Sequence, residues 1–596
     1  MTGPWRRAAP WVAGSLAAGV LVLDPAYAAP GVAGPLTSGD TLFPNQGNGG
    51  YDVGHYDLDL AWDPGPPGSG GTIDATATIS AATTGQPLSS FGLDLQGLTV
   101  SSVSVDGAVA AFSRIDEPDG TLPGRHKLVV TPSTPVDGTF TVVVAYGGEP
   151  DIRHDTDGSD EGWIPTADGA TFMNQPIGSM TGFPNNNTPA DKATYTISVD
   201  VPAGLEVVSN GEPTLPLPDG SGTRSVWRWT EARPMASELV LVSIGQYEVK
   251  QSDVGLSGGR TVPEWSFIDS AIYAADQTSI DDRRAELSSI LTGLEARLGP
   301  YPGQSTGIVV DQTFVGYALE TQDRPTFPSA GSVGGTLVHE LTHQWYGDAV
   351  SPTVWNDLWI NEGMATWAPV DLSGASTYDE FHGEWASTSA ASSRWKVPPA
   401  GITDPADLFG WQSYDRGAMT YEALRTLIGD PAFRTLIKQW QLLNHGGSHG
   451  AADLQALAEQ ISGLDLDAFF QDWIRDPDKP AWPTPGQPPT DPPPTNPPPQ
   501  PPTQPAALTI GPGCRVRLEG AARVRHTLTV KVRGCPAGST YGYRWLAGGT
   551  RITGATKRTY QITRGKIGQR IRVEVTVRAS GYYNAVRTSK ATPKVR

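Results

Sequence analysis

The chain has 596 residues, a mass of 63.1 kDa and a formal net charge of −19. Such a length exceeds what one ordinary hydrophobic core covers and indicates three or four compact units at roughly 150 residues each. The only cysteines are Cys514 and Cys535 near the C-terminus, so catalysis by a thiol is excluded for the rest of the chain.

Residues 1–28 are predicted to be a secretory signal peptide. Arg6 and Arg7 begin the segment, an apolar stretch follows over residues 8–23, and small residues stand at Ala26 and Ala28. The alternative is an uncleaved membrane anchor, but the apolar stretch falls short of the roughly 20 residues that a span needs. We therefore expect a secreted, extracellular protein, either free or associated with the cell wall, whose mature chain has no membrane span.

Residues 40–247 are predicted to form an N-terminal β domain. The segment "HYDLDLAW" (55–62) alternates apolar and polar residues with the period of two expected of a half-buried strand. "GTFTVVVAY" (138–146), "ATYTISVDV" (193–201) and "SELVLVSIG" (237–245) follow the same pattern between Gly, Pro and Asp turns. Several such strands in succession indicate a β domain.

Residues 248–482 are predicted to be mainly helical. Apolar residues recur at spacings of three and four in "DDRRAELSSILTGLEARLG" (281–299), "AMTYEALRTLIGDPAFRTLIKQWQLL" (418–443) and "DLQALAEQISGLDLDAFFQDWI" (453–474). The helical part ends at residues 483–505, where 13 of 23 residues are proline. Such a run favours an extended polyproline II spacer of roughly 70 Å, so we expect it to separate two independent units.

Residues 506–596 are predicted to form a small β-sandwich of short strands and Gly turns. They contain 19 Lys and Arg against two acids, a net charge of +17, whereas the rest of the chain has 24 basic and 60 acidic residues. Cys514 and Cys535 are expected to form one disulfide because a zinc site would need more ligands than His526, the only histidine between them. The segments "YRWLAGGTRITGAT" and "GYY" resemble landmarks of Ig-like modules of exported bacterial proteins.

The charge of this module indicates two alternatives for its role. It can attach the protein to anionic cell-wall polymers by screened long-range attraction, or it can act only as a solvated module that keeps the protein soluble. No nucleic-acid partner is expected, because the Tyr and Trp residues follow strand patterns and no recognisable binding motif is present.

The segment "HELTH" (339–343) is the strongest chemical motif in the chain. On a helix, His339 and His343 lie one turn apart on the same face, so their imidazoles can bind one zinc ion, with Glu340 beside them. A catalytic zinc needs a third protein ligand and an open position for water. Glu362 follows after an 18-residue gap in "WNDLWINEGMATW", and we expect one Zn²⁺ per chain bound by these three ligands.

The segment "HELTHQWYGDAVSPTVWNDLWINEGMATW" resembles the core of the gluzincin aminopeptidase N family, and the resemblance extends over about residues 40–480. It implies a saddle-like N-terminal β domain, then a thermolysin-like α/β catalytic domain with its own short sheet, and an active site between them. The family's C-terminal helical domain is missing here, because "FFQDWIRDPDKPAWP" continues directly into the proline-rich linker.

The resemblance also implies roles for single residues. Glu340 is the general base, and Tyr414 in "SYDRGAMTYEAL" is the tyrosine that stabilises the oxyanion. Glu320 in "GYALETQDRPTF" binds the free α-amine of the substrate, and Gln175 in "NQPIGSMTGFPNNNTPADKATY" reaches the same amine. For Gln175, an ordinary loop amide is the competing interpretation.

Two positions depart from the family pattern. The family's GAMEN element reads YALET at residues 317–321, which keeps the amine-binding Glu320 and loses the Gly and Asn. Seven residues after Glu362, the family usually has a carboxylate that orients a zinc-bound histidine, and this chain has Pro369. Either Asp371 replaces that carboxylate from a kinked helix, or the zinc is bound less tightly.

Together, the signal-like segment, the metal motif and the family resemblance predict an exported zinc aminopeptidase. Such an enzyme releases N-terminal residues from peptides with a free N-terminus. One alternative is a zinc endopeptidase or another zinc hydrolase on the same fold, since only Glu320 and Gln175 indicate amine capture. Another is a cell-surface-binding protein with a vestigial peptidase domain, which the presence of all three zinc ligands and Glu340 disfavours.

Overall fold

The computed structural model describes residues 31–484 and 514–596, apart from positions 67, 121, 216, 219, 537–538, 549, 553–554, 556 and 579–584. The chain divides into two compact units, Met1–Asp491 and Pro492–Arg596. The expected signal peptide and nearly all of the expected linker lie outside the described residues. None of the helices in the described ranges combines the length and hydropathy that a membrane crossing requires.

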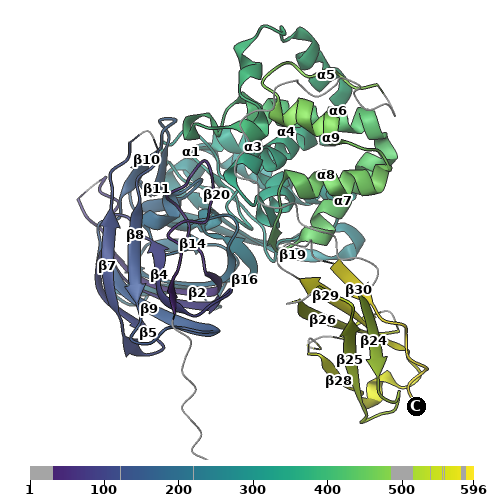
Figure 1. Cartoon of the computed structure of the whole chain (residues 1–596). Helices are drawn as coiled ribbons and strands as arrows, with labels where there is room; N and C mark the ends of the chain where they lie inside the picture. Colours follow the sequence, from purple (N-terminus) through teal and green to yellow (C-terminus); the bar gives the residue numbers. More distant parts are fainter. Residues whose placement is uncertain are drawn as a thin grey trace, which may run out of the picture. The chain divides into compact units, whose positions relative to one another are not determined.

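The N-terminal part of the first unit consists of strands (Figure 1, purple to blue). They are β1 Val32–Ala33, β2 Tyr51–Asp63, β3 Thr72–Thr83, β4 Leu88–Asp94, β5 Thr99–Val105, β6 Ala108–Val109, β7 Ala111–Asp116, β8 His126–Thr131, β9 Thr139–Gly148, β10 Ile152–His154, β11 Asp160–Pro165, β12 Ala170–Met173, β13 Lys192–Pro202, β14 Glu206–Ser209, β15 Glu212–Pro213, β16 Arg224–Ala236 and β17 Val242–Gly245. They pair in an eight-stranded sheet (β15-β16-β13-β2-β3-β9-β5-β6), a five-stranded sheet (β10-β11-β12-β17-β14) and a four-stranded sheet (β1-β4-β8-β7).

The strand prediction for this part is confirmed with one exception. In β2 the apolar residues of the alternating pattern, such as Leu58 and Trp62, are buried in the core, since successive side chains of a strand point to opposite faces. The segment 237–245 differs, because it begins with a 3-10 turn at Ser237–Leu239 and only Val242–Gly245 is a strand. All residues of that turn are buried, so its apolar pattern reflects burial rather than strand geometry.

The remaining part of the first unit contains a small sheet and nine helices among the described residues (Figure 1, teal to green). The sheet has the order β18-β19-β20-β21, as the family resemblance implies, and two more short strands pair as β22-β23. These strands are β18 Tyr247–Gly255, β19 Thr261–Asp269, β20 Val309–Val310, β21 Thr326–Phe327, β22 Val350–Ser351 and β23 Gly447–Ser448. The helices are α1 Ser270–Ala285, α2 Leu287–Leu298, α3 Ala330–His343, α4 Trp359–Ser373, α5 Thr377–Ser387, α6 Trp411–Ile428, α7 Asp430–Asn444, α8 Ala451–Ser462 and α9 Asp467–Phe470.

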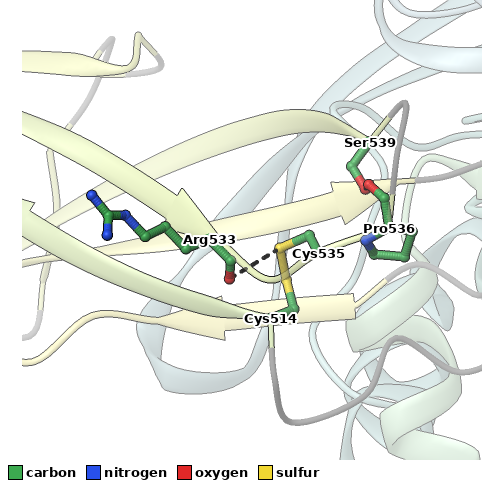
Figure 2. The surroundings of a disulfide bond; sticks show 5 residues. All are labelled: Cys514, Arg533, Cys535, Pro536 and Ser539. Atoms are coloured by element: carbon green, nitrogen blue, oxygen red, sulfur yellow. Dashed lines mark hydrogen bonds between the residues drawn. A yellow bond between two sulfur atoms is a disulfide. The ribbon is translucent and has the colours of Figure 1, made fainter.

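The second unit is a module of short antiparallel strands (Figure 1, olive to yellow). The strands are β24 Arg515–Glu519, β25 Thr527–Arg533, β26 Thr540–Ala547, β27 Thr550–Arg551, β28 Thr559–Gln561, β29 Ile571–Arg578 and β30 Ala585–Thr588. They form two sheets, β24-β25-β28 and β27-β26-β29-β30, that share one hydrophobic core around Trp545. The expected disulfide between Cys514 and Cys535 is present (Figure 2).

Candidate metal centre and active site

Helix α3 presents the two histidines of the motif on one face. Its N-terminus is capped by Ser329, whose hydroxyl accepts a hydrogen bond from the amide of Ser332. His339 and His343 are one turn apart, and their Nε2 atoms lie 3.2 Å from each other. Two imidazole nitrogens this close can share a bound cation, because each offers a lone pair when its other ring nitrogen carries the proton.

Glu362 completes this arrangement from the first turn of helix α4. Its Oε2 atom lies 3.3 Å from Nε2 of His339 and 3.3 Å from Nε2 of His343. Three ligands at the usual zinc distances of about 2.0–2.1 Å in tetrahedral geometry are about 3.3 Å apart. Oε2 of Glu362 is also buried and accepts no hydrogen bond within the described chain. Both the spacing and the uncompensated oxygen fit a bound Zn²⁺.

The imidazole of His343 is oriented by the turn that ends helix α3. Its Nδ1 lies 2.9 Å from the carbonyl oxygen of Tyr346, so this nitrogen donates a hydrogen bond and Nε2 keeps its lone pair for the metal. The turn is possible because Gly347 has φ 139°, a region that favours glycine.

Helix α6 approaches helix α4 at a glycine pair beside the metal centre. A Cβ atom on Gly363 would lie 2.6 Å from the backbone of Gly417, and one on Gly417 would lie 3.0 Å from Gly363. Because neither residue has a side chain, the two backbones meet directly, and Tyr414 in the first turn of α6 comes close to the zinc ligands. Its ring stacks on His339 with 6.1 Å between the ring centroids.

All seven residues singled out in the sequence line one cavity of about 630 Å³. They are Gln175, Glu320, His339, Glu340, His343, Glu362 and Tyr414. No Lys or Arg is found among the described residues that line the cavity. Residues separated by more than 200 positions in the sequence therefore meet at one acidic site, next to the three metal ligands.

The N-terminal β region and the catalytic region meet at one end of this cavity. Nε2 of Gln175 donates a hydrogen bond to Oε1 of Glu320 at 2.7 Å, and the hydroxyl of Tyr317 donates to the carbonyl oxygen of Asp160, also at 2.7 Å. Glu320 is buried, with 3% of its surface exposed. The Gln175 side chain thus faces Glu320 within the cavity.

The carboxyl group of Glu340 is also buried in the cavity wall, with 5% of its surface exposed. Burial raises its pKa to about 7, although the neighbouring His339 and His343 act in the opposite direction. A carboxyl group with a pKa near neutrality can take up and release a proton at physiological pH.

The structure excludes one of the two alternatives for Pro369. This residue lies in helix α4 and lines the cavity. Asp371 does not replace the missing carboxylate, because its Oδ2 accepts from Arg297 at 2.5 Å and its Oδ1 accepts from Arg434 at 2.6 Å. Two positions further along a helix, its side chain points about 200° away from that of Pro369. The hypothesis that Asp371 orients a zinc-bound histidine is therefore wrong.

The sequence analysis missed several residues that line the cavity. Thr336 lies on α3 one turn before His339 and Glu340, so helical periodicity indicates its position once the histidines are assigned. Asp157 and Ser159 come from the loop between β10 and β11. No local pattern could have found them, because only the packing of the β region against the helices brings this loop to the cavity.

Comparisons with known proteins agree with this site. Residues 320–473 match the peptidase family M1 domain. Aminopeptidase N of Streptomyces lividans is 25% identical over 454 residues, which cover 71% of this chain and 50% of that protein. The probable aminopeptidase 1 of Saccharolobus solfataricus is 26% identical over 315 residues, which cover 49% of this chain and 39% of that protein. The chain thus spans half or less of the length of these curated relatives.

A solved structure matches over its whole length. The M1 zinc metallopeptidase from Deinococcus radiodurans is 26% identical, has a TM-score of 0.66, and aligns with 76% of this chain and 100% of its own. The paired histidines and the glutamate of the next helix form a three-ligand arrangement that fits zinc, and the fold is similar to that of an M1 zinc metallopeptidase. In sequence, the chain is similar to aminopeptidase N and to peptidase family M1.

Proposed function

We propose that this chain is a zinc aminopeptidase that hydrolyses the first peptide bond of substrates with a free N-terminus. The observation that carries the proposal is the position of Glu320 and Gln175 at the end of the cavity that holds His339, His343 and Glu362. A buried carboxylate binds an ammonium group strongly, since it is short of positive partners. The bound amine would hold the chain end at a fixed distance from the metal ligands.

The side chains around the cavity then divide the chemical work. Zn²⁺, when bound, polarises the peptide carbonyl and lowers the pKa of a water molecule. Glu340, beside the metal ligands in the cavity wall, accepts the proton of that water and transfers it to the departing amine. The hydroxyl of Tyr414 donates a hydrogen bond to the oxyanion that develops on the carbonyl. Its position next to His339 supports this role.

The experiment is a comparison of aminoacyl-p-nitroanilides with a free and an acetylated α-amine. We expect hydrolysis of the free-amine compounds only, and loss of activity after chelation of zinc. Glu340→Gln should keep zinc bound and lower kcat by about 10²–10⁴-fold, the usual contribution of a general base. Equal cleavage of acetylated substrates would favour the endopeptidase alternative.

We also propose that the protein is exported and that residues 506–596 are an Ig-like β-sandwich that retains it at the cell surface. Two features support this: the signal-like sequence at residues 1–28, and a net charge of +17 in a module with two sheets on one core. The anionic polymers of the cell wall are the proposed partner. Salt-sensitive retention on cell envelopes, lost on deletion of residues 483–596, tests this role.

A further inference from the structure

The outer face of the sheet β24-β25-β28 carries an unusual arrangement of positive charges. In the register of β24 and β25, Arg515 lies opposite Arg533 and Arg517 lies opposite Lys531. These four side chains alternate with residues of the hydrophobic core, so they share the solvent-facing side of the sheet. Two like-charged pairs therefore stand directly opposite each other on adjacent strands, a placement that destabilises a sheet.

The carboxylates of the module do not neutralise this face. Within the described residues its two acids are Glu519 and Glu574. Glu519 lies 3.8 Å from Lys531 at one end of the face, and Glu574 pairs with Arg544 on the other sheet. Among the residues of the module that the structure describes, the three arginines of the face have no carboxylate partner.

The second sheet shows the contrasting arrangement. There Arg544 lies directly opposite Glu574 in the register of β26 and β29, and the two side chains form an ion pair. The same module thus pairs opposite charges on one sheet and like charges on the other. General enrichment in basic residues for solubility does not require like charges to face each other on adjacent strands.

The disulfide lies at the end of the two strands that carry these charges. Cys514 directly precedes β24, and Cys535 follows β25 after one residue, so the bond joins both strands next to Arg515 and Arg533 (Figure 2). A covalent link at this point opposes the separation of strands that repel each other. The strand pair is therefore linked covalently beside the pair Arg515 and Arg533.

From this arrangement we propose that the outer face of β24 and β25 binds a linear phosphodiester polymer without bases, of the poly(glycerol phosphate) type. The proposal rests on the proposed role of the module as a surface anchor and names the binding face and its ligand. The Cβ atoms that carry these side chains are about 5 Å apart across the strands and about 6.8 Å apart along them, so the side chains can reach successive phosphates of one extended chain. Three of the four cations are arginines, whose planar donors suit phosphate oxygens.

A nucleic acid is the less suitable partner for this face. Binding of single strands without sequence preference uses aromatic side chains on which the bases stack. The remaining side chains of the face come from alternate positions of β25 and β28 and are the polar residues Thr527, Thr529, Thr559 and Gln561. Among the described residues, this face therefore has no aromatic ring on which a base can stack.

The test uses the full chain and a synthetic glycerol phosphate decamer, with the dissociation constant measured at several salt concentrations. The double substitution Arg515→Gln and Arg517→Gln should weaken binding at least tenfold at 0.1 M salt. It should also lower the slope of log K against log salt by about 1.4, from about 0.7 per lost phosphate contact. Arg544→Gln, which removes a cation opposite an acid, should leave both quantities unchanged.

The thermal stability of the module and its binding of a nucleic acid provide two further tests. Because the double substitution relieves repulsion, it should raise the thermal transition of the module, identified in the full chain by its sensitivity to reduction of the disulfide. A lower transition temperature of the double variant would overturn the assignment of this face. Equal weakening of decamer binding by Arg544→Gln would also overturn it. Tighter binding of a thymidine decanucleotide would instead show a nucleic-acid site. If deletion of residues 483–596 abolishes binding but the double variant keeps it, the anchor role stands and the face is wrong.

Discussion

The contact between Gly363 and Gly417 allows a quantitative prediction for the substitution Gly363→Ala. A Cβ atom at this position would lie 2.6 Å from the backbone of Gly417, whereas ordinary van der Waals contact begins at 3.4 Å. Because the obstacle is backbone, helices α4 and α6 must separate by roughly 0.8 Å. Overpacking of this kind costs about 1–3 kcal/mol, of which the better helix propensity of Ala recovers up to about 1 kcal/mol.

The same movement separates the groups that the two helices bring together. Glu362 directly precedes Gly363, and Tyr414 lies three residues before Gly417. A displacement near 1 Å of a catalytic group can cost on the order of 10²-fold in rate. We therefore expect Gly363→Ala to lower kcat/KM of a free-amine aminoacyl-p-nitroanilide by about 10–100-fold, with a net loss of about 1–2 kcal/mol in the free energy of unfolding.

The matched control is Gly383→Ala in the exposed part of helix α5. A Cβ atom there meets nothing within 4 Å, so this substitution should stabilise the helix by about 0.5–1 kcal/mol and leave kcat/KM unchanged. Urea unfolding and steady-state kinetics of both variants provide the measurements. The reasoning about the helix crossing is refuted if Gly363→Ala keeps wild-type stability and activity, or if both variants behave alike.

Three other predictions concern separate parts of the molecule. Tyr414→Phe should lower kcat by about 10²–10³-fold and leave the zinc content unchanged. Steady-state kinetics and metal analysis measure these two quantities, and a loss of kcat below threefold would exclude the oxyanion role. Burial and the nearby Asp52 raise the pKa of Asp191 to about 7 in the folded protein. Ionisation of this carboxyl group therefore lowers the free energy of unfolding as the pH rises from about 4 to about 7. Asp52→Asn should accordingly increase the free energy of unfolding, measured by urea denaturation, by less than about 1 kcal/mol at pH 8 and leave it unchanged at pH 4. An equal gain at both pH values would contradict the sign. Deletion of residues 483–596 should leave kcat/KM unchanged, because every residue of the cavity precedes the deletion, and a loss of activity would show that the module supports the site.

The metal centre could be predicted well because its spacing is local. The separation of His339 and His343 by one helical turn follows from the geometry of any α-helix, and the structure places their Nε2 atoms 3.2 Å apart. Glu362 belongs to the adjoining helix, so a fixed gap in the sequence was sufficient to indicate it. The roles of Glu320, Gln175 and Tyr414 came only from the family resemblance, because no local spacing connects these residues to the metal ligands.

The helix boundaries could be predicted less well. The run 281–299 has one helical pattern, yet the structure divides it between α1 and α2 at Glu286. The apolar spacing continues across such a break, because α1 and α2 both bury their apolar faces in the same hydrophobic core. The division between α6 and α7 falls at Gly429, where a φ of 82° is unfavourable for other residues. Only this second break has a visible cause in the sequence.

The sequence by itself determined the chemistry of this protein: two histidines and Glu340 on one helix, a glutamate on the next, and a basic module after a proline-rich run. These features depend on residue type and on spacing within a few helical turns. Only the tertiary structure decided that Asp371 binds arginines, that Asp157 reaches the cavity, and that Arg515 faces Arg533. Each depends on which distant segments pack together, and packing is set by the shape and burial of the whole core rather than by any local pattern.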